Sequence, residues 1–401
     1  MIATGGGIVE TAAARAVLAA HWPVVQALKP IEDIEAYLSS DGSRPDLGTP
    51  PREVYARRAP WYDEVSDVDV LIAPRESDWG APQAQLAALL GRVRGTAAAA
   101  AAARPYSFFL SLTLPELSAD RPLPAAIFEG SDVVEMRVDL LADTSTDAIR
   151  RYLALLRKQS GGRPVLYTVR SVGEGGRFGG STDEYLRLNE VGLRAGCEML
   201  DLEAARDGPP MRDMIARAAR LGIGIVGSFH ELGPMPSQEG VIAALRRCCL
   251  GGAAAVAKFV GVASEPSHAL LVHSAAAAAE LPVPHIALAM GPFGRMSRVL
   301  NATLTPVTHP LLPAAAAPGQ LSVAEITAVR RSLGYLPSKE FFLFGTPTKH
   351  SPSPAIHNAG FEANGCGHTY GTVETDEAPP PLDPARQRLA ASSTPLDPAR
   401  R

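Results

Sequence analysis

At 401 residues the chain is too long for one ordinary core, so it fits two or three domains, or one large barrel with attached segments. A net charge of -4, with arginines scattered along the sequence, excludes a basic face for nucleic acid or an anionic membrane. No apolar run approaches the roughly 18 residues of a membrane-spanning helix. The start also lacks the pattern of a secretory leader. We therefore expect a cytoplasmic protein with a small polar ligand.

The cysteines give no sign of a metal centre or of disulfides. They form no CxxC pair, and none has a histidine at ligand spacing. We expect reduced, mostly buried thiols, and neither a metal nor a cofactor is predicted. The cysteines are Cys197, Cys248, Cys249 and Cys366.

The first stretch, residues 1–95, alternates helical and extended patterns. It opens with Gly5, Gly6 and Gly7, and the alanine-rich sequence after them predicts a helix that begins just past the glycines. Residues 96–104 contain an unbroken alanine run from Ala97 to Ala103. Because this run has no apolar periodicity and no turn residues, we interpret it as a linker.

From Tyr106 the pattern changes to short aliphatic runs separated by amphipathic helical stretches, as in parallel βα units. Eight such units fit a closed barrel better than an open sheet, because no run is followed by the GxGxxG turn of a dinucleotide-binding half. The predicted fold class is therefore α/β, a (β/α)8 TIM barrel over residues 105–338. The predicted strands are 106–114, 133–138, 164–170, 198–203, 223–229, 254–260, 285–290 and 302–307.

After Ser338 a short C-terminal α/β fragment is predicted over residues 339–376. An extended apolar run, Phe341 to Phe344, precedes a Ser/Pro-rich loop and a helix that begins near Ala355. Residues 377–401 are rich in proline and alanine and repeat the sequence Pro-Leu-Asp-Pro-Ala-Arg. We expect this tail to be disordered.

Active sites of such barrels lie at the carboxyl ends of the strands, so polar residues that end apolar runs are the candidates for chemistry. They include one lysine, one histidine, three arginines and several acids. In chain order they are Ser111, Glu135, Arg137, Arg170, Glu174, His230, Lys258, Arg298 and Gln320.

Lys258 stands alone in an apolar strand, where burial disfavours the charged amine and leaves some of it nucleophilic. A structural lysine, ion-paired or with its head in water, is the alternative. His230 ends the neighbouring strand and suits proton transfer, although a single histidine is often structural. Glu174 or Glu135 is expected to fix its tautomer.

The arginines would be costly to bury without partners, so either they pair with nearby acids, or they bind an anionic ligand, or both. Together with a Schiff-base lysine and an acid/base histidine they predict chemistry on a carboxylated ketone: imine formation, loss of an α-proton and elimination. The arginines are Arg137, Arg170 and Arg298, and the acids are Glu135, Asp139 and Glu174.

Six ordered strings make the barrel resemble the type I 3-dehydroquinate dehydratases, as that domain occurs in fungal pentafunctional AROM polypeptides. They are Val-Val-Glu-Met-Arg-Val-Asp-Leu-Leu (133–141), Tyr-Thr-Val-Arg-Ser followed by Glu-Gly-Gly (167–176), Gly-Ser-Phe-His-Glu (227–231), Ala-Lys-Phe-Val-Gly-Val-Ala (257–263), Gly-Arg-Met-Ser-Arg-Val-Leu-Asn (294–301) and Ala-Pro-Gly-Gln (317–320).

The resemblance implies a hydro-lyase of the shikimate pathway, which leads to chorismate and the aromatic amino acids. Lys258 would form the imine with 3-dehydroquinate, and His230, oriented by Glu174, would remove the adjacent proton and assist loss of water. Arg298 would hold the substrate carboxylate. Some members have serine where this chain has Ala316, so their contact from that side chain is not expected here. The remaining ligand-binding residues would be Ser111, Glu135, Arg137, Arg170 and Gln320.

The flanks resemble incomplete parts of the same polypeptide. Residues 1–95 are similar to the later part of shikimate kinase, in which Gly5, Gly6 and Gly7 match a shikimate-contacting run. They lack the phosphate-binding GxxxxGK[ST] loop, so kinase activity is not expected. Residues 339–376 resemble the start of shikimate dehydrogenase, with Ser351 and Ser353 at its carboxylate-binding positions. Both sets are interpreted as vestigial.

Two other interpretations remain open. The chain would be a ligand sensor if it acted like the fungal quinate-pathway repressor, whose domains are related to these. A regulator has no need of Lys258 and His230 together, which favours an enzyme. The second alternative is an inactive AROM fragment. Whether the barrel forms a homodimer is also open.

Overall fold

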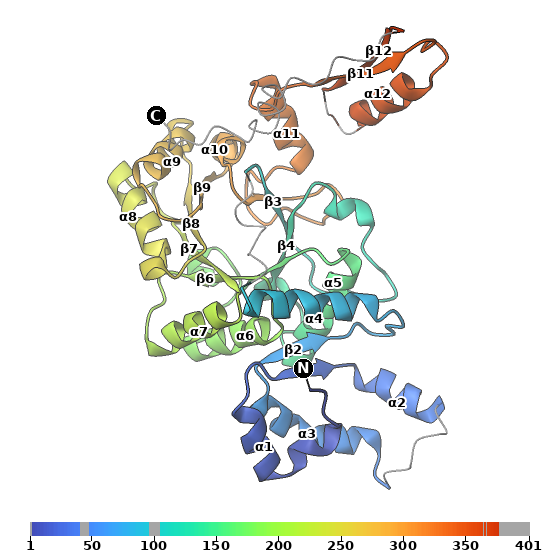
Figure 1. Ribbon diagram of the computed structural model, residues 1–401. Coiled ribbons are helices and arrows are strands. Elements are labelled where there is room, and N and C mark those ends of the chain that lie inside the picture. The colour runs from blue at the N-terminus through green and yellow to red at the C-terminus, as the bar shows by residue number, and fades with distance from the viewer. Residues whose placement is uncertain (1, 41–47, 96–104, 364, 366, 377–401) are drawn as a thin grey trace. The chain divides into compact units, whose positions relative to one another are not determined.

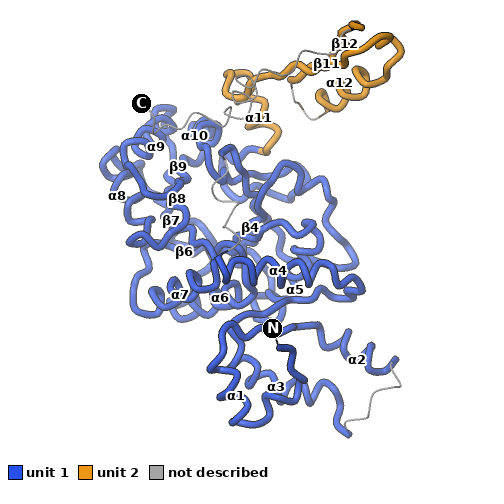
Figure 2. Tube along the Cα trace, viewed as in Figure 1, with its two compact units in different colours: residues 1–321 blue, residues 322–401 orange. Residues whose placement is uncertain are grey.

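The computed structural model describes residues 2–40, 48–95, 105–363, 365 and 367–376. The chain divides into two compact units, Met1–Leu321 and Ser322–Arg401 (Figure 2). The linker predicted at 96–104 and the tail predicted at 377–401 lie outside the described residues. The predicted domain bounds at 95, 105 and 338 stay a prediction. None of the helices in the described ranges is long and apolar enough to cross a membrane.

The larger unit contains a sheet of eight parallel strands with helices around its outside (Figure 1). The strands follow one another in chain order from β3 to β9, and the last strand, β10, pairs with the first. All eight predicted strands are confirmed, and with them the (β/α)8 fold. Their bounds are β3 Phe108–Leu112, β4 Val133–Arg137, β5 Val165–Thr168, β6 Met199–Glu203, β7 Gly224–His230, β8 Val256–Val262, β9 His285–Met290 and β10 Thr305–Val307.

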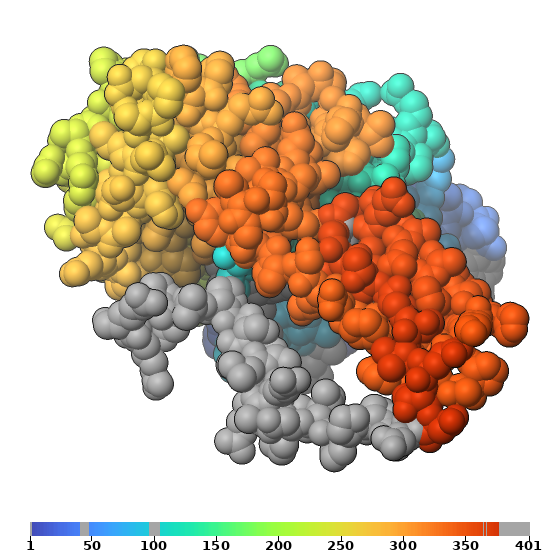
Figure 3. Space-filling view, turned by 90° about the horizontal axis from the view of Figure 1, so that it is seen from above, coloured from blue at the N-terminus to red at the C-terminus, as the bar shows by residue number. Residues whose placement is uncertain are grey.

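Helices cover the outside of this sheet, and α5 and α6 show the reason most clearly, since each has one apolar face and a polar start. The side chain of Ser145 caps one of them, and Ser181 with Glu184 forms a capping box at the next. The helices α8, α9 and α10 pack side by side (Figures 1 and 3). The helix bounds are α5 Thr146–Gln159, α6 Thr182–Arg194, α7 Pro209–Arg220, α8 Gln238–Cys248, α9 Ser267–Ala278 and α10 Arg295–Leu300.

The barrel is nearly closed, because β9 and β10 are not paired by backbone hydrogen bonds. Side chains connect this part of the barrel instead. The amide of Ala289 on β9 donates to Ser297 Oγ at 2.9 Å, and the amide of Ala287 donates to Asn301 Oδ1 at 3.2 Å. Arg298 of the same helix donates from a terminal guanidinium nitrogen to the carbonyl of Pro306 on β10, at 3.3 Å. The segment after β9 therefore satisfies backbone groups that a neighbouring strand would otherwise pair with.

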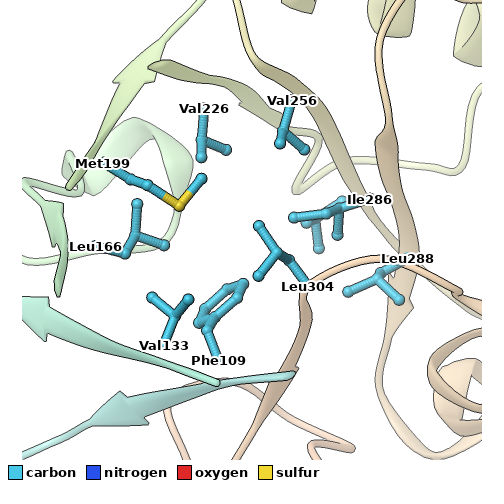
Figure 4. Packing of buried hydrophobic residues seen from close by; sticks show 10 residues of the cluster. Phe109, Val133, Leu166, Met199, Val226, Val256, Ile286, Leu288 and Leu304 are labelled. Atoms are coloured by element: carbon cyan, nitrogen blue, oxygen red, sulfur yellow. The ribbon is translucent and has the colours of Figure 1, made fainter. Parts of the chain in front are cut away.

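An apolar layer fills the lower part of the barrel (Figure 4). Each strand contributes an inward-facing residue, because side chains alternate between the two faces of a strand. This close-packed layer makes the barrel solid at that level rather than a pore. It contains Phe109, Val133, Leu166, Met199, Val226, Val256, Ile286 and Leu304, the last of which directly precedes β10, and the same cluster includes Val260 and Leu288.

The N-terminal part of the larger unit contains a small parallel sheet, β1 with β2. The helix predicted to begin just past the glycines begins later, at Ala12, as α1, because a short 3-10 turn, η1, occupies Gly6–Glu10 and Thr11 caps the helix. The bounds are η1 Gly6–Glu10, α1 Ala12–Ala19, β1 Val25–Leu28, α2 Ile31–Ser40, α3 Pro51–Val65, β2 Val68–Leu71 and α4 Gly80–Val93.

Strand β2 packs against the barrel helices α5 and α6 through a buried carboxylate. Asp69 of β2 accepts hydrogen bonds from Arg150 of α5 at 2.9 Å and from Arg194 of α6 at 3.3 Å. A second contact comes from α4, where Arg92 donates to the carbonyl of Gly196 at 2.8 Å and to Glu198 at 2.9 Å. Charged hydrogen bonds with buried partners thus join this part to the barrel.

Asp69→Asn is expected to lower the free energy of unfolding by about 3 kcal/mol, because two arginines lose the charge that compensates for their burial. Urea unfolding of the variant and the wild type measures the difference. Equal stability of the two proteins would contradict the prediction. Asp69 does not lie at the carboxyl ends of the barrel strands, so the substitution should leave any reaction at those ends unaffected.

The smaller unit contains a parallel pair of strands and two helices. The extended run predicted at Phe341 to Phe344 is confirmed as part of β11, and the helix predicted near Ala355 begins two residues earlier. The bounds are α11 Val323–Ser332, β11 Glu340–Gly345, α12 Ser353–Ala363 and β12 Thr369–Glu374.

Candidate active site

A polar layer lies directly above the apolar layer, towards the carboxyl ends of the strands. Because strand side chains have a period of two, the residue two positions after each apolar one also faces the interior. On six consecutive strands that residue is polar and buried: Ser111, Glu135, Thr168, Asp201, Ser228 and Lys258. Two positions further along, at the ends of four of these strands, the residues that face the interior are Arg137, Arg170, Glu203 and His230. The fold therefore gathers most of the predicted residues in one interior.

Lys258 forms a buried ion pair in this layer. Its Nζ lies 2.9 Å from Asp201 Oδ2, and it also lies over the ring of Phe109, 5.5 Å from the centroid. The ion-paired alternative for this lysine is therefore correct as a description of its contacts. The strand itself is apolar apart from this lysine, and the partner comes from β6, because the barrel interior brings Asp201 next to the amine on β8.

Arg170 connects the lysine and histidine parts of the site. Its guanidinium donates to Asp201 Oδ1 at 2.6 Å, to Glu174 at 2.9 Å and to Ser228 Oγ at 2.9 Å. Burial alone would lower the pKa of Arg170, but the surrounding carboxylates outweigh burial and raise it. Arg170 therefore stays charged and holds these acids in place.

His230 is oriented by Glu174. The Nδ1 atom of His230 lies 2.9 Å from Glu174 Oε2, which also accepts the backbone N–H of His230 at 3.2 Å. This network assigns the ring proton to Nδ1 and leaves Nε2 free to accept one. Burial lowers the pKa of His230 well below its ordinary value, and the charges of Arg170 and Lys258 lower it further. The ring is therefore neutral near pH 7 and able to act as a base.

Of the two acids expected to orient His230, Glu174 takes that position and Glu135 does not. Glu135 accepts a hydrogen bond from Thr168 at 2.8 Å instead. Burial raises the pKa of Glu174 from 4.5 to about 7, although Arg170 opposes the shift. The folded chain therefore keeps a proton on Glu174 that the unfolded chain has already released between pH 4.5 and about 7.

The unfolding free energy should consequently fall as the pH rises through that range, since the folded state binds more protons there. Glu174→Gln is neutral at every pH and should lose this dependence. We expect the variant to gain stability relative to the wild type between pH 5 and pH 8, by a few kcal/mol at most. Urea unfolding at both pH values measures it, and a constant difference would contradict the assignment.

The other two arginines differ in their partners. Arg137 forms a pair of 2.8 Å hydrogen bonds with Asp139. Arg298 is 1% exposed, has no carboxylate partner within the described part of the chain, and has an Nε atom without a hydrogen bond. Burial lowers its pKa to about 10. The pairing alternative thus holds for Arg137 and Arg170, and the binding of an anion by Arg298 stays a prediction.

The last predicted ligand residues lie together at one side of the interior. Gln320 donates to Ser111 Oγ at 3.4 Å, and its Oε1 accepts the amide of Ala316 at 2.8 Å. The structure does not add the predicted vestigial residues to this site. Gly5, Gly6 and Gly7 lie at η1, where the hydroxyl of Tyr62 donates to the Gly6 carbonyl. Ser351 and Ser353 belong to the smaller unit, where the Ser353 amide donates to Ser351 Oγ.

Four site residues were missed from the sequence: Thr168, Asp201, Glu203 and Ser228. A signal was available, because each lies two positions along a predicted strand from another inward-facing residue. Asp201 lies in the middle of β6 and Glu203 at its end, and neither was among the candidates. Within the described ranges, no group of histidine, cysteine and acidic side chains is arranged to hold a metal.

The family model for type I 3-dehydroquinase matches residues 108–337, more than half of the chain. The chain belongs to the type I 3-dehydroquinase family. A model for shikimate kinase matches residues 1–84, in front of the dehydroquinase barrel.

The chain is also similar to parts of longer proteins. The pentafunctional AROM polypeptide of Malassezia globosa is 40% identical over 389 residues, which are 94% of this chain and 23% of that polypeptide. The chain thus spans about a quarter of the length of this relative. The solved dehydroquinate dehydratase and shikimate dehydrogenase of S. pombe AroM is 31% identical with a TM-score of 0.62, covering 69% of this chain and 54% of that one.

A bacterial dehydroquinase shares the fold alone. The type I 3-dehydroquinate dehydratase of Clostridium difficile is 22% identical, with a TM-score of 0.52. The match covers 59% of this chain and 96% of that one.

Proposed function

We propose that the barrel converts 3-dehydroquinate to 3-dehydroshikimate by eliminating water through an imine on Lys258, as a step of the shikimate pathway. The observation that carries the proposal is the position of Lys258 and His230 on adjacent strands. Ser228 of β7 lies opposite Lys258 of β8 in the strand register. His230 is two residues after Ser228 on β7, so its side chain is on the same face. An amine and a neutral imidazole therefore face the same interior.

The chemistry begins with attack of the Lys258 nitrogen on the substrate ketone. The nitrogen, which is an ammonium before the reaction, gives up two protons, and the ketone oxygen takes them and leaves as water. The resulting cationic imine attracts electrons from the adjacent C–H bond. His230 Nε2 accepts that proton, and the electrons move into an enamine. The enamine then expels the β-hydroxyl group, which takes the proton back from His230 and departs as water. Hydrolysis of the imine releases the product and restores the amine.

Arg298 is proposed to bind the substrate carboxylate. It is buried and free of acidic partners among the described residues, and a carboxylate ligand would supply the missing charge. Gln320, Ser111, Glu135, Arg137 and Arg170 are proposed to surround the ring of the substrate.

Arg298→Met should raise KM about 100-fold with a smaller change in kcat, because a charge-assisted contact to the bound carboxylate is lost. Without substrate, the variant should be as stable as the wild type or more stable, since an unpaired buried cation has been replaced by an apolar chain. Steady-state kinetics and urea unfolding measure the two effects. An unchanged KM would remove Arg298 from the binding site.

The deciding experiment is turnover of 3-dehydroquinate, followed by the ultraviolet absorbance of the conjugated product. Sodium borohydride added during turnover should reduce the imine and leave a permanent mass increase on the protein. Turnover with this adduct supports the proposal. Binding of the substrate without turnover would favour the ligand sensor, and neither binding nor turnover would favour an inactive fragment.

Several expectations stay predictions from the sequence. They are a cytoplasmic location, the lack of nucleic-acid and membrane partners, and the question of a homodimer. The vestigial character of the two flanks also stays a prediction.

A further inference from the structure

We propose that Asp201 is the positioning residue for the Lys258 amine, which it holds beside the apolar layer before and after the imine forms. This inference rests on the proposed function. It assigns a role to a carboxylate that accepts the Lys258 ammonium, whereas the His230 ring contacts a different acid, Glu174. The role is to fix where the nucleophilic nitrogen lies.

The contacts of Asp201 use both carboxylate oxygens. Oδ2 accepts the Lys258 ammonium at 2.9 Å, and Oδ1 accepts Arg170 at 2.6 Å and Ser228 at 2.5 Å. The Asp201 side chain is fully buried, and the Lys258 side chain is 6% exposed. The hydrogen bonds to Oδ1 thus come from Arg170, just after β5, and from Ser228 on β7. They fix the orientation of the carboxylate, so that Oδ2 points towards the amine on β8.

A lysine needs such a fixed acceptor because its four-carbon stem is flexible and its charge is compact. Within the described residues, Asp201 is the acceptor that hydrogen-bonds to the Lys258 ammonium. The partners of Asp201 restrict Nζ to one place at the boundary between the apolar and the polar layers. A nucleophile held close to its attack position reacts faster than one that occupies many rotamers, because only a few of those rotamers place it for attack.

The carboxylate remains useful after the amine has reacted. The imine nitrogen carries a positive charge, as the ammonium did, so Oδ2 faces a cation in both states. Burial would raise the pKa of Asp201, but Arg170 and Lys258 outweigh burial and lower it. Asp201 therefore stays ionised and does not itself take the proton that the amine must lose. Its effect on the reaction is one of position and charge.

Asp201→Asn keeps the shape of the side chain and removes its charge. We expect the rate of borohydride-trappable imine formation with 3-dehydroquinate to fall about 100-fold, as for a misplaced reacting group. The turnover number kcat should fall with it, while KM changes little, because the carboxylate of the substrate is proposed to bind elsewhere. Rapid quenching into borohydride, followed by intact mass measurement of the full chain, gives the trapping rate.

Asp69→Asn is the matched control. Asp69 is also a fully buried aspartate held by two side-chain hydrogen bonds from arginines, but it belongs to β2 and contacts the outer helices α5 and α6 instead of the site. It should lose stability and keep the wild-type trapping rate. If Asp201→Asn does not fold, Ser228→Ala removes one fastening of Oδ1 and should slow trapping by a smaller factor.

The outcomes separate the two proposals. A wild-type protein that neither turns over nor traps the substrate would overturn the proposed function, and this inference with it. Trapping at the wild-type rate in folded Asp201→Asn, or in Ser228→Ala where it is the variant used, would overturn the inference alone. Slow trapping with normal KM, set against fast trapping in Asp69→Asn, would support it.

Discussion

Replacing Lys258 with alanine should abolish dehydration, with a loss of roughly 10⁶-fold in kcat, the size that follows removal of a covalent nucleophile. No imine can form, so the C–H bond beside the ketone loses the cation that makes its proton removable. The borohydride adduct should disappear at the same time. Without the ammonium, Asp201 keeps its bonds from Arg170 and Ser228, so the variant should fold.

The matched control is Lys158→Ala. Lys158 is a half-exposed lysine on α5 that pairs with Glu76 at 3.0 Å, outside the barrel interior. This variant should turn over and trap the substrate like the wild type. Residual dehydration by Lys258→Ala at a substantial rate would exclude the imine mechanism, even if the reaction itself were correctly identified.

His230→Gln should lower kcat about 1000-fold, within the range for loss of a general acid/base. The variant keeps the amine, so the imine should still form and then accumulate because its α-proton is not removed. Intact mass measurement after borohydride should therefore show most of the protein modified. The two variants should therefore give opposite results with borohydride. Lys258→Ala should form no adduct, and His230→Gln should form more adduct than the wild type.

For the histidine prediction the comparison is His273→Gln, a change at an exposed position on α9. It should leave kcat and the amount of trapped imine unchanged. If His230→Gln formed no adduct, His230 would be required for imine formation rather than for the later proton transfer. If it turned over normally, another group would be the base.

The sequence was sufficient to predict the strands and most of the strand-end residues, because both follow from local patterns. The eight apolar runs needed no knowledge of their neighbours, and His230 and Arg170 stand where such runs end. The partner of Lys258 was not predicted, because Asp201 is 57 residues away in the chain and meets it only when β6, β7 and β8 lie in register.

The packing of the N-terminal part against the barrel was also not predicted. Asp69 and Arg194 are 125 residues apart, and neither has a local feature that marks it as a contact. The same limit applies to Arg298, whose lack of an acidic partner depends on every side chain around it. Patterns along a chain predict elements, whereas the pairing of buried charges depends on the assembled structure.

The missing ladder between β9 and β10 makes one part of the barrel depend on the identity of side chains. Elsewhere the strands are joined by backbone groups that nearly every amino acid possesses, so substitutions there leave the joints intact. Between β9 and β10 the joints are Ser297 and Asn301, in the same short segment as Arg298. A substitution at Ser297 or Asn301 would therefore change both the closure of the barrel and the position of Arg298. Selection that preserves the position of Arg298 would then also preserve the closure of the barrel.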